Sequence, residues 1–160
     1  MELVYTLFKK MKRAHLCGII EINNLVFYVK EYAMKFYKEL LMDHFQNPRN
    51  KGRLENSDFS TDQYNPSCGD SISIQGCVND GVLTEVAFVG KGCVISQAAA
   101  SILSELCIGK AIDEILAIKK TDVPQLIGID DLGPTRLKCA LLSLVALQDG
   151  LLEYQNKEEG

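Results

Sequence analysis

The spacing of apolar residues locates the expected strands in the middle of the chain. From residue 71 to 78, apolar and polar side chains alternate, which is typical of a half-buried β-strand. Asn79-Asp80-Gly81 is a hairpin-turn sequence, so the following segment is expected to return antiparallel to the first. Gly90-Lys91-Gly92 predicts a second turn. The predicted strands are residues 71–78, 82–89 and a short third one at 93–95.

Beyond residue 95 the apolar spacing lengthens to about 3.6 residues, the period of an α-helix. Ser96 is expected to cap the first of these helices, and Gly109 to end it. An earlier amphipathic helix is expected to end near Phe45, before Pro48, with a polar loop over 56–65. That helix has Phe36, Leu40, Leu41 and His44 or Phe45 near one face. The later helices are predicted at 96–107, 111–118, 124–127 and from about Pro134. The last one carries one apolar stripe, made of Leu137, Leu141, Leu144, Val145, Leu151 and Leu152.

Strands come first along the chain and helices follow, an order typical of α+β domains. We therefore predict a three-stranded antiparallel sheet covered by helices. The chain has 160 residues, of which 47% are hydrophobic and 24% charged, as in one globular domain. Its formal net charge of -4 provides no basic surface for a phosphate backbone, so nucleic acid is not expected as a partner.

The balance of charge changes sign near residue 33, just before a second methionine, Met34. Residues 1–33 carry five basic and three acidic side chains, whereas the remainder carries 12 basic and 18 acidic ones. Residues 1–33 are expected to be either an accessory N-terminal extension or, in the interpretation that we favour, a segment upstream of a translation start at Met34. The main domain is expected over 34–153, followed by a polar tail at 154–160.

The N-terminal segment lacks the pattern of a signal peptide. Basic residues precede the apolar run 16–20, but Glu21 interrupts it and no small-residue cleavage site follows. No uncharged stretch approaches the roughly 18 residues of a membrane-spanning helix. We therefore expect no membrane association, and a cytoplasmic protein whose thiols are reduced.

Six cysteines beside only two histidines are the unusual feature of the composition. None lies in a C-x-x-C pair, so any metal site must be assembled from distant segments. Cys17 lies in the expected extension and is interpreted as incidental. Cys77, within a strand, and Cys107, at an apolar helix position, are interpreted as packing residues, because free cysteine behaves as a small hydrophobe.

Three cysteines and one aspartate are placed differently. Cys68 lies in a Pro/Gly-rich loop, where Gly69 permits an unusual turn and Asp70 follows, so a thiolate and a carboxylate can face one cation. Cys93 precedes a helix whose positive end favours a thiolate. Cys139 is expected opposite the apolar stripe of the last helix, with nearby basic residues again favouring the thiolate.

Cys68, Asp70, Cys93 and Cys139 together provide three sulfur ligands and one oxygen ligand. Zinc accepts such a set tetrahedrally. Permanent iron–sulfur clusters normally have four cysteines, so a carboxylate at one corner indicates a site that releases its cargo. The same thiolates are also candidate acceptors of sulfur as persulfide.

Four motifs in fixed order resemble the NifU N-terminal/IscU family of iron–sulfur cluster assembly scaffolds, over about residues 34 to 153. The motifs are Tyr37-Lys-Glu-Leu-Leu-Met-Asp43-His44-Phe-Gln-Asn47-Pro48-Arg49-Asn50-Lys-Gly52, Asn65-Pro-Ser-Cys68-Gly69-Asp70, Gly90-Lys-Gly-Cys93-Val-Ile-Ser96-Gln-Ala98-Ala-Ala-Ser101 and Arg136-Leu-Lys-Cys139-Ala. The resemblance implies the sandwich of sheet and helices found in that family. It also implies assembly of a transient [2Fe-2S] or [4Fe-4S] cluster from iron and from sulfur of a cysteine desulfurase, with transfer to acceptor apo-proteins. The family's ligands correspond to Cys68, Asp70, Cys93 and Cys139.

Two departures leave the branch of the family open. Lys138 stands where the IscU branch has a histidine, and the Hsp70-recruiting segment of that branch is absent, which speaks against an Hsp70-type chaperone as a partner. Arg136 is similar to the SufU branch, whose members bind zinc and accept persulfide, but the interval from Cys93 to Cys139 is shorter than in that branch. The alternative function is therefore a zinc-dependent sulfurtransferase, and a third is a structural zinc domain without turnover.

The remaining candidates are residues for partner contact. Arg49, Asn50 and Lys51 form a polar loop that is either simply solvated or, as the resemblance implies, in contact with a desulfurase, and Arg136 is a further candidate. His44 is interpreted as a surface or boundary residue near a helix C-terminus, rather than a ligand, because the set of four ligands is already complete.

Overall fold

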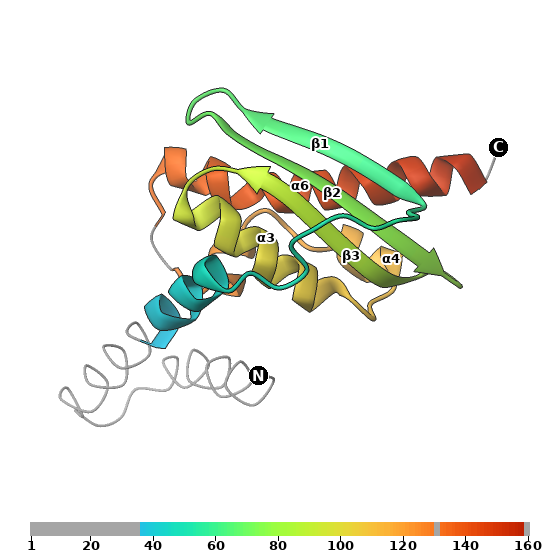
Figure 1. Cartoon of the computed structure of the whole chain (residues 1–160), viewed down its shortest axis with the longest axis horizontal. Helices are drawn as coiled ribbons and strands as arrows, with labels where there is room; N and C mark the ends of the chain where they lie inside the picture. The colour runs from blue at the N-terminus through green and yellow to red at the C-terminus, as the bar shows by residue number, and fades with distance from the viewer. Residues whose placement is uncertain (1–35, 130–131, 159–160) are drawn as a thin grey trace, which may run out of the picture. The chain divides into compact units, whose positions relative to one another are not determined.

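The computed structural model describes residues 36–129 and 132–158 and confirms the predicted fold class. A three-stranded antiparallel sheet in the order β1-β2-β3 is packed against helices (Figure 1). The strands are β1 (Phe59–Asn65), β2 (Asp70–Asn79) and β3 (Val82–Lys91). The helices are 36–46, α3 (Val94–Cys107), α4 (Ile112–Leu116), α5 (Val123–Leu126) and α6 (Pro134–Glu158). The expected extension at 1–33 lies outside the described residues.

The predicted hairpin is confirmed. β2 and β3 pair from Ser71 with Lys91 to Asn79 with Val82. Asp80 and Gly81 both have positive φ angles, 49° and 74°, as the turn between two twisted strands requires. The alternation that predicted β2 is also observed, because Ile72 and Ile74 are buried whereas Ser71 and Ser73 are half-buried.

The prediction of a third strand at residues 93–95 is wrong, as is the prediction of a loop over 56–65. The third strand is β1, and Val94 already belongs to α3. β1 is polar, but its burial alternates, with Phe59, Thr61 and Asn65 facing the helices. Thr61 Oγ1 donates a hydrogen bond of 2.7 Å to the Ala146 carbonyl of α6, so a polar side chain is accommodated on the inner face.

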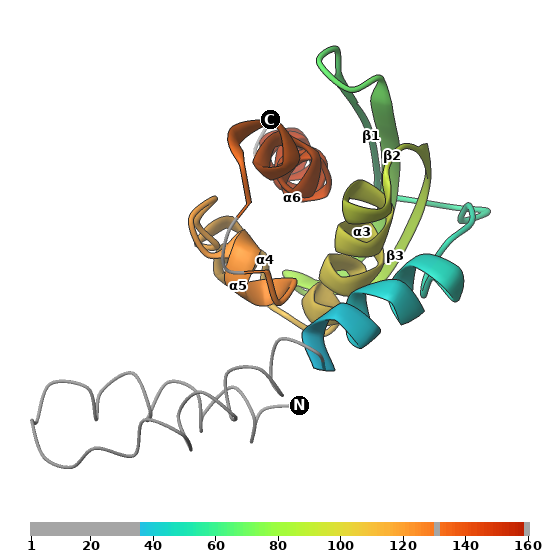
Figure 2. The ribbon, with the colours of Figure 1, turned by 90° about the vertical axis from the view of Figure 1, so that its left-hand side faces the viewer.

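The longest helices lie on one face of the sheet (Figure 2). α6 packs on β1 and β2, whereas α3 packs on β3 and against α6. This arrangement brings the amino-terminal turns of α3 and α6 to the end of the sheet at which β2 begins. In the described part of the chain, no helix is long and apolar enough to cross a membrane.

The buried face of α6 differs from the predicted stripe. Leu144 and Leu151 are buried as expected, but Leu152 is 45% exposed. Small residues take the place of the missing leucines, because α6 is enclosed by the sheet on one side and by α3 on another. The buried residues of α6 are Cys139, Ala140, Leu142, Ser143, Leu144, Ala146, Leu147, Gly150 and Leu151. The helix continues through Glu158, with Tyr154 packed against the core.

An aromatic ring fixes β1 to α6. The side chain of Phe59 lies between Gly76 of β2 and Gly150 of α6. A Cβ atom added at Gly76 would come within 2.6 Å of Phe59 Cε1, and one added at Gly150 within 2.7 Å of Phe59 Cε2. The ring therefore needs glycine on both sides, and the close approach of β1 to α6 depends on this.

Candidate metal site

A tight turn between β1 and β2 presents Cys68 next to Asp70. The carbonyl oxygen of Asn65 accepts hydrogen bonds from the backbone N–H groups of Cys68, at 3.3 Å, and Gly69, at 2.9 Å. Gly69 has a φ of 76°, which confirms the predicted need for glycine at this turn. Asp70 opens β2, directly opposite Asn65, so the thiol and the carboxylate come from the same end of the sheet.

The first turns of α6 bring a third candidate ligand to this loop. Cys139 Sγ lies 3.1 Å from Cys68 Sγ, although the two residues are 71 positions apart in the chain. One ligand atom from each of Cys68, Asp70 and Cys139 lies within 4.8 Å of the others. Two sulfurs and a carboxylate oxygen at this separation are close enough to contact one metal ion, so these residues form a candidate metal site.

The carboxylate of Asp70 is buried, with 3% of the residue exposed. Oδ1 accepts a hydrogen bond of 3.3 Å from the backbone N–H of Cys93, whereas Oδ2 is buried and has no hydrogen-bond partner among the described residues. Burial alone would raise the pKa of Asp70, but the polar groups of Ser96 and of the site cysteines around the carboxylate outweigh burial, so the pKa is lowered. A buried, ionised oxygen without a partner fits a cation at this position.

Gly92 creates the space for this carboxylate. A Cβ atom at Gly92 would lie 2.6 Å from Asp70 Cγ and 2.9 Å from Oδ1, and it would also collide with Ser96 Oγ. Any side chain here would displace the carboxylate. The prediction of a turn at Gly90-Lys91-Gly92 is wrong for its first two residues, which belong to β3, whereas Gly92 follows the strand and leaves room for Asp70.

Cys93 lies beside the other three candidates but is not within the group of atoms that they form. It is the N-cap residue of α3, a position that the sequence analysis gave to Ser96, and it is exposed. Its backbone N–H contacts Asp70, and its carbonyl oxygen accepts a hydrogen bond of 3.0 Å from Ser96 Oγ. Ser96 is thus the third residue of the helix, where its side chain lies beside Asp70, and the prediction that it caps the helix is wrong. Ligation by Cys93 remains a prediction.

The environment of Cys139 differs from the expected one. The residue is only 3% exposed, so it does not lie on the free side of α6. Burial, followed by the hydrogen bonds to Cys68 and Asp70, raises the pKa of the Cys139 thiol. The expectation that nearby basic residues favour its thiolate is therefore wrong for the metal-free protein, because Arg136 and Lys138 are exposed and Cys139 is not.

All five cysteines of the described residues are free thiols. Cys107 is fully buried in the core, and burial raises its pKa to about 11, which confirms a packing role. Cys77 is only half-buried, and its Sγ lies 3.3 Å from the Asn56 carbonyl oxygen. Cys17 lies outside the described residues.

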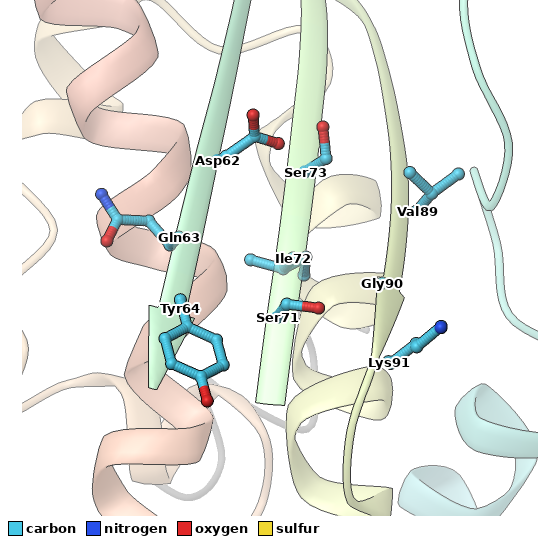
Figure 3. Close-up of a pocket in the computed structure, with 9 residues that line it drawn as sticks. All are labelled: Asp62, Gln63, Tyr64, Ser71, Ile72, Ser73, Val89, Gly90 and Lys91. Atoms are coloured by element: carbon cyan, nitrogen blue, oxygen red, sulfur yellow. The ribbon is translucent and has the colours of Figure 1, made fainter. Parts of the chain in front are cut away.

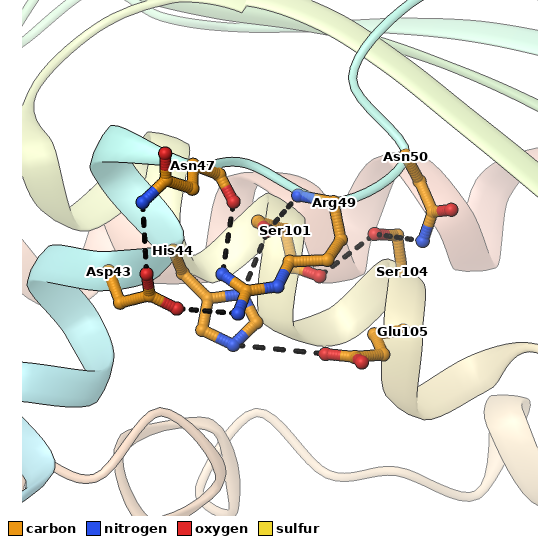
Figure 4. A network of polar contacts seen from close by, with 8 residues as sticks. All are labelled: Asp43, His44, Asn47, Arg49, Asn50, Ser101, Ser104 and Glu105. Carbon is orange, nitrogen blue, oxygen red and sulfur yellow. Dashed lines mark hydrogen bonds and ion pairs between the residues drawn. The ribbon is translucent and has the colours of Figure 1, made fainter.

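His44 was interpreted from the sequence as a surface or boundary residue, but it is buried, with 3% of the residue exposed. It belongs to a network of polar contacts (Figure 4), in which its Nδ1 lies 2.8 Å from Ser101 Oγ of α3. The same hydroxyl accepts a hydrogen bond of 2.8 Å from the backbone N–H of Arg49. The Arg49 guanidinium pairs with Asp43, and Asn50 Nδ2 donates to Ser104 Oγ at 3.1 Å. These polar contacts attach helix 36–46 and the loop after it to α3.

We predict that the free energy of unfolding of the metal-free protein falls as the pH is lowered from 7 to 5. Burial, together with the charge of Arg49, lowers the pKa of His44 below its unfolded value of 6.5. The unfolded chain therefore takes up the proton first, so stability that is present above the unfolded pKa is lost as the pH falls through the folded pKa. Denaturant unfolding at several pH values measures this.

The chain's two histidines provide the control for this experiment. His44→Asn keeps a hydrogen-bonding side chain that does not titrate, so its stability should vary less between pH 7 and 5. His15→Gln should retain the wild-type dependence. A dependence that survives in His44→Asn and disappears in His15→Gln would contradict the assignment to His44.

The other residues expected to contact a partner lie on the surface. Lys51 and Arg136 are exposed.

On the outer face of the sheet, a hollow of about 540 Å³ begins one row of residues away from the site (Figure 3). Tyr64, Ser71 and Lys91, which are neighbours across the three strands, form the end of the hollow nearest to Asp70. The three clustered ligand candidates do not line it.

Asn65, Ser96 and Gly92 are site residues to which the sequence analysis gave no role in the site. Asn65 Oδ1 accepts a hydrogen bond of 3.1 Å from the Ser67 N–H, which makes an Asx turn. An asparagine before a proline and a serine is a known turn signal, so this contact was detectable in the sequence. The contact of Ser96 with Asp70 was not detectable in the sequence, because the two residues lie in different elements.

A three-stranded antiparallel sheet with helices on one face defines a small α+β domain, and two thiols and a carboxylate at the end of the sheet form its candidate metal site. Residues 36–160 match the family described as NifU-like N terminal domain. The chain belongs to this family, whose members include scaffolds for iron–sulfur cluster assembly.

Two relatives represent different branches of the family. The chain is 36% identical over 140 residues to the zinc-dependent sulfurtransferase SufU of Bacillus subtilis (strain 168), with 78% of this chain and 92% of the relative covered. It is 34% identical over 127 residues to the iron-sulfur cluster assembly scaffold protein IscU of Escherichia coli (strain K12), with 77% and 97% covered. Such similar identities leave the branch open.

Solved structures show the same fold. The N-terminal part of a nitrogen-fixing NifU-like protein from Brucella abortus matches with a TM-score of 0.65 at 22% identity, over 76% of this chain and 95% of that one. The SufU protein of Fervidobacterium islandicum AW-1 matches with a TM-score of 0.58 at 29% identity, over 71% and 94%.

Proposed function

We propose that this chain is a cytoplasmic scaffold that builds a labile iron–sulfur cluster on Cys68, Asp70, Cys93 and Cys139 and transfers it to acceptor apo-proteins. The observation that supports this most is the buried Asp70 Oδ2, which has no hydrogen-bond partner within 36–129 and 132–158 and lies beside two cysteine sulfurs 3.1 Å apart. Thiolates hold iron firmly, and an oxygen ligand at one corner holds it less firmly, as release requires. The cluster is cargo, [2Fe-2S] or [4Fe-4S], and not a resident cofactor.

Sulfur would reach the site as persulfide from a cysteine desulfurase. A site thiolate attacks the outer sulfur of the donor's persulfide, so that one S–S bond breaks, another forms and the donor cysteine leaves as a thiolate. Two electrons from an external reductant then convert the bound sulfur to sulfide. Cys68 and Cys93 are exposed to the donor, whereas Cys139 is buried. Arg49, Asn50, Lys51 and Arg136 are the proposed contacts with the desulfurase.

The second candidate function is that of a zinc-dependent sulfurtransferase. The set of three sulfurs and one oxygen suits tetrahedral zinc. The SufU relative, at 36% identity, carries that activity in its name, and the position of Arg136, three residues before Cys139, is similar to that branch. In this case zinc would organise the site and one cysteine would accept and pass on persulfide.

Anaerobic reconstitution of the full-length protein with iron, cysteine, a desulfurase and a thiol reductant tests the proposal. The scaffold function predicts visible absorption bands of a cluster, and loss of those bands when an apo-acceptor is added. Uptake of zinc and persulfide without cluster bands would overturn it in favour of the sulfurtransferase. Zinc binding without any stimulation of the desulfurase would leave a structural zinc domain.

We further predict that Asp70→Ala slows the transfer of a bound cluster to an acceptor. The carboxylate is the weakest ligand for iron and adds a negative charge to the thiolates, so an incoming acceptor ligand displaces it first. Without it, we expect transfer to be about tenfold slower, on the order of 1.4 kcal/mol in activation free energy. Asp62→Ala, which removes an exposed carboxylate from β1, is the control. Faster loss of cluster from Asp70→Ala would show that the carboxylate holds the cargo.

A further inference from the structure

Asn65 makes contact with both sulfur-bearing segments of the site. It is the last residue of β1 and only 6% exposed. Its backbone carbonyl oxygen accepts hydrogen bonds from the N–H groups of Cys68 and Gly69, and its Oδ1 accepts one from Ser67. The remaining polar group of its side chain, Nδ2, donates toward Cys139 Sγ at 3.8 Å. One asparagine therefore shapes the Cys68 loop and reaches across to α6.

The contact between Nδ2 and Cys139 has a chemical consequence that a packing contact would not have. An N–H donor aimed at a ligand sulfur withdraws electron density from it and fixes its orientation, and such donors tune the metal held by the sulfur. Burial of Cys139 strengthens the effect, because few waters compete for the sulfur at this depth. The exposed cysteines, Cys68 and Cys93, are open to solvent instead.

We propose that Asn65 is a positioning residue of the metal site, whose side-chain amide holds the Cys139 sulfur and lowers its electron density when the sulfur binds a metal. The proposal rests on the proposed function only in that the site binds a metal through Cys139. It applies equally to a cluster and to zinc. The Asx turn made by Asn65 Oδ1 is a separate role of the same side chain, which shapes the loop that carries Cys68.

Two substitutions separate the amide donor from the turn. Asn65→Ser removes the N–H donor without adding charge, and its hydroxyl can still accept from the Ser67 N–H. Asn65→Asp keeps the acceptor of the turn and the size of the side chain but replaces the amide nitrogen by a carboxylate oxygen. Gln63→Glu is the matched control, because it makes the same change from amide to acid on β1, where Gln63 Nε2 donates to Asp149 of α6 at 2.8 Å.

Cobalt(II) is the probe, added to the full-length, metal-free protein under anaerobic conditions. Thiolate ligands give sulfur-to-cobalt charge-transfer bands, whose energy falls as the sulfur becomes richer in electrons. We expect both Asn65 variants to shift these bands to lower energy, and Asn65→Ser to bind cobalt about tenfold more weakly than wild type. Gln63→Glu should leave the band energy unchanged, even if its stability falls.

The outcomes distinguish this inference from the proposed function. If wild-type protein shows no sulfur-to-cobalt bands, the metal site itself is contradicted. If wild type shows them and Asn65→Ser has the same band energy, the inference about Asn65 is overturned and the residue only shapes the loop. If Asn65→Ser does not fold, unshifted bands in Asn65→Asp would overturn the inference in the same way.

Discussion

Cys139→Ser is expected to abolish tight binding of zinc or iron by the full-length protein. A serine hydroxyl stays protonated at neutral pH and is a poor ligand for either metal. Since Cys139 is buried and contacts both Cys68 and Asp70, water cannot easily take the place of the lost sulfur. We expect the dissociation constant for zinc to rise at least about a hundredfold, on the order of 2.7 kcal/mol. Competition with a chromophoric chelator measures this.

Cys107→Ser is the matched control for this substitution. Cys107 is also a buried free cysteine, but it belongs to the hydrophobic core and not to the candidate site. The change therefore reproduces the cost of placing a hydroxyl where a thiol was buried, without removing a ligand. We expect lower stability and wild-type affinity for zinc. If Cys139→Ser bound zinc as tightly as Cys107→Ser, Cys139 would not be a ligand.

Phe59→Ala is expected to cause the largest loss of stability, about 3–5 kcal/mol in the free energy of unfolding. The ring is buried between Gly76 and Gly150, and neither glycine has a side chain that could move into the space left by its removal. The void would lie between β1 and α6, next to the hydrogen bond from Thr61 to Ala146. Denaturant unfolding of the metal-free protein measures the change, with unchanged slope as the sign of intact two-state behaviour.

A double-mutant cycle tests whether the ring accounts for the glycine at position 150. Gly150→Ala alone should destabilise the fold by about 1–3 kcal/mol through overpacking, even though alanine favours helix by about 1 kcal/mol. In a Phe59→Leu background the same substitution should cost less, because the smaller side chain leaves room for a methyl group. Equal costs in both backgrounds would show that Gly150 serves another purpose.

The elements predicted best from the sequence are those with strong local signals. The Asn79-Asp80-Gly81 turn, flanked by alternating residues, identified both strands of the hairpin. Pro134 and Gly109 marked a helix start and a helix end that the structure confirms. Cys68 and Asp70 were predicted as metal ligands because they flank Gly69 in a tight turn, where a packing role explains a cysteine poorly. Each of these signals lies within a few neighbouring residues.

The features that sequence reasoning missed depend on contacts between distant segments. β1 looked like a loop because its inward residues are largely polar, and only α6 and β2 supply the partners that make a strand favourable there. The burial of His44 involves α3, whose Ser101 is 57 residues away in the chain and contacts the imidazole ring. Cys139 is buried because α6 is covered on two sides, which a pattern of leucines alone does not reveal.

The short distance between the sulfur atoms of Cys68 and Cys139 also affects how stable the folded chain is. Cys68 and Cys139 are separated by 71 residues, so an ion bound to both closes a long loop and acts as a cross-link between a surface turn and the last helix. Closing a loop of that length removes conformational freedom from the unfolded chain and so favours the folded one. Binding of the ion would therefore stabilise the folded domain, and release of the ion would destabilise it. Resistance to proteolysis would therefore differ between the filled and the empty protein.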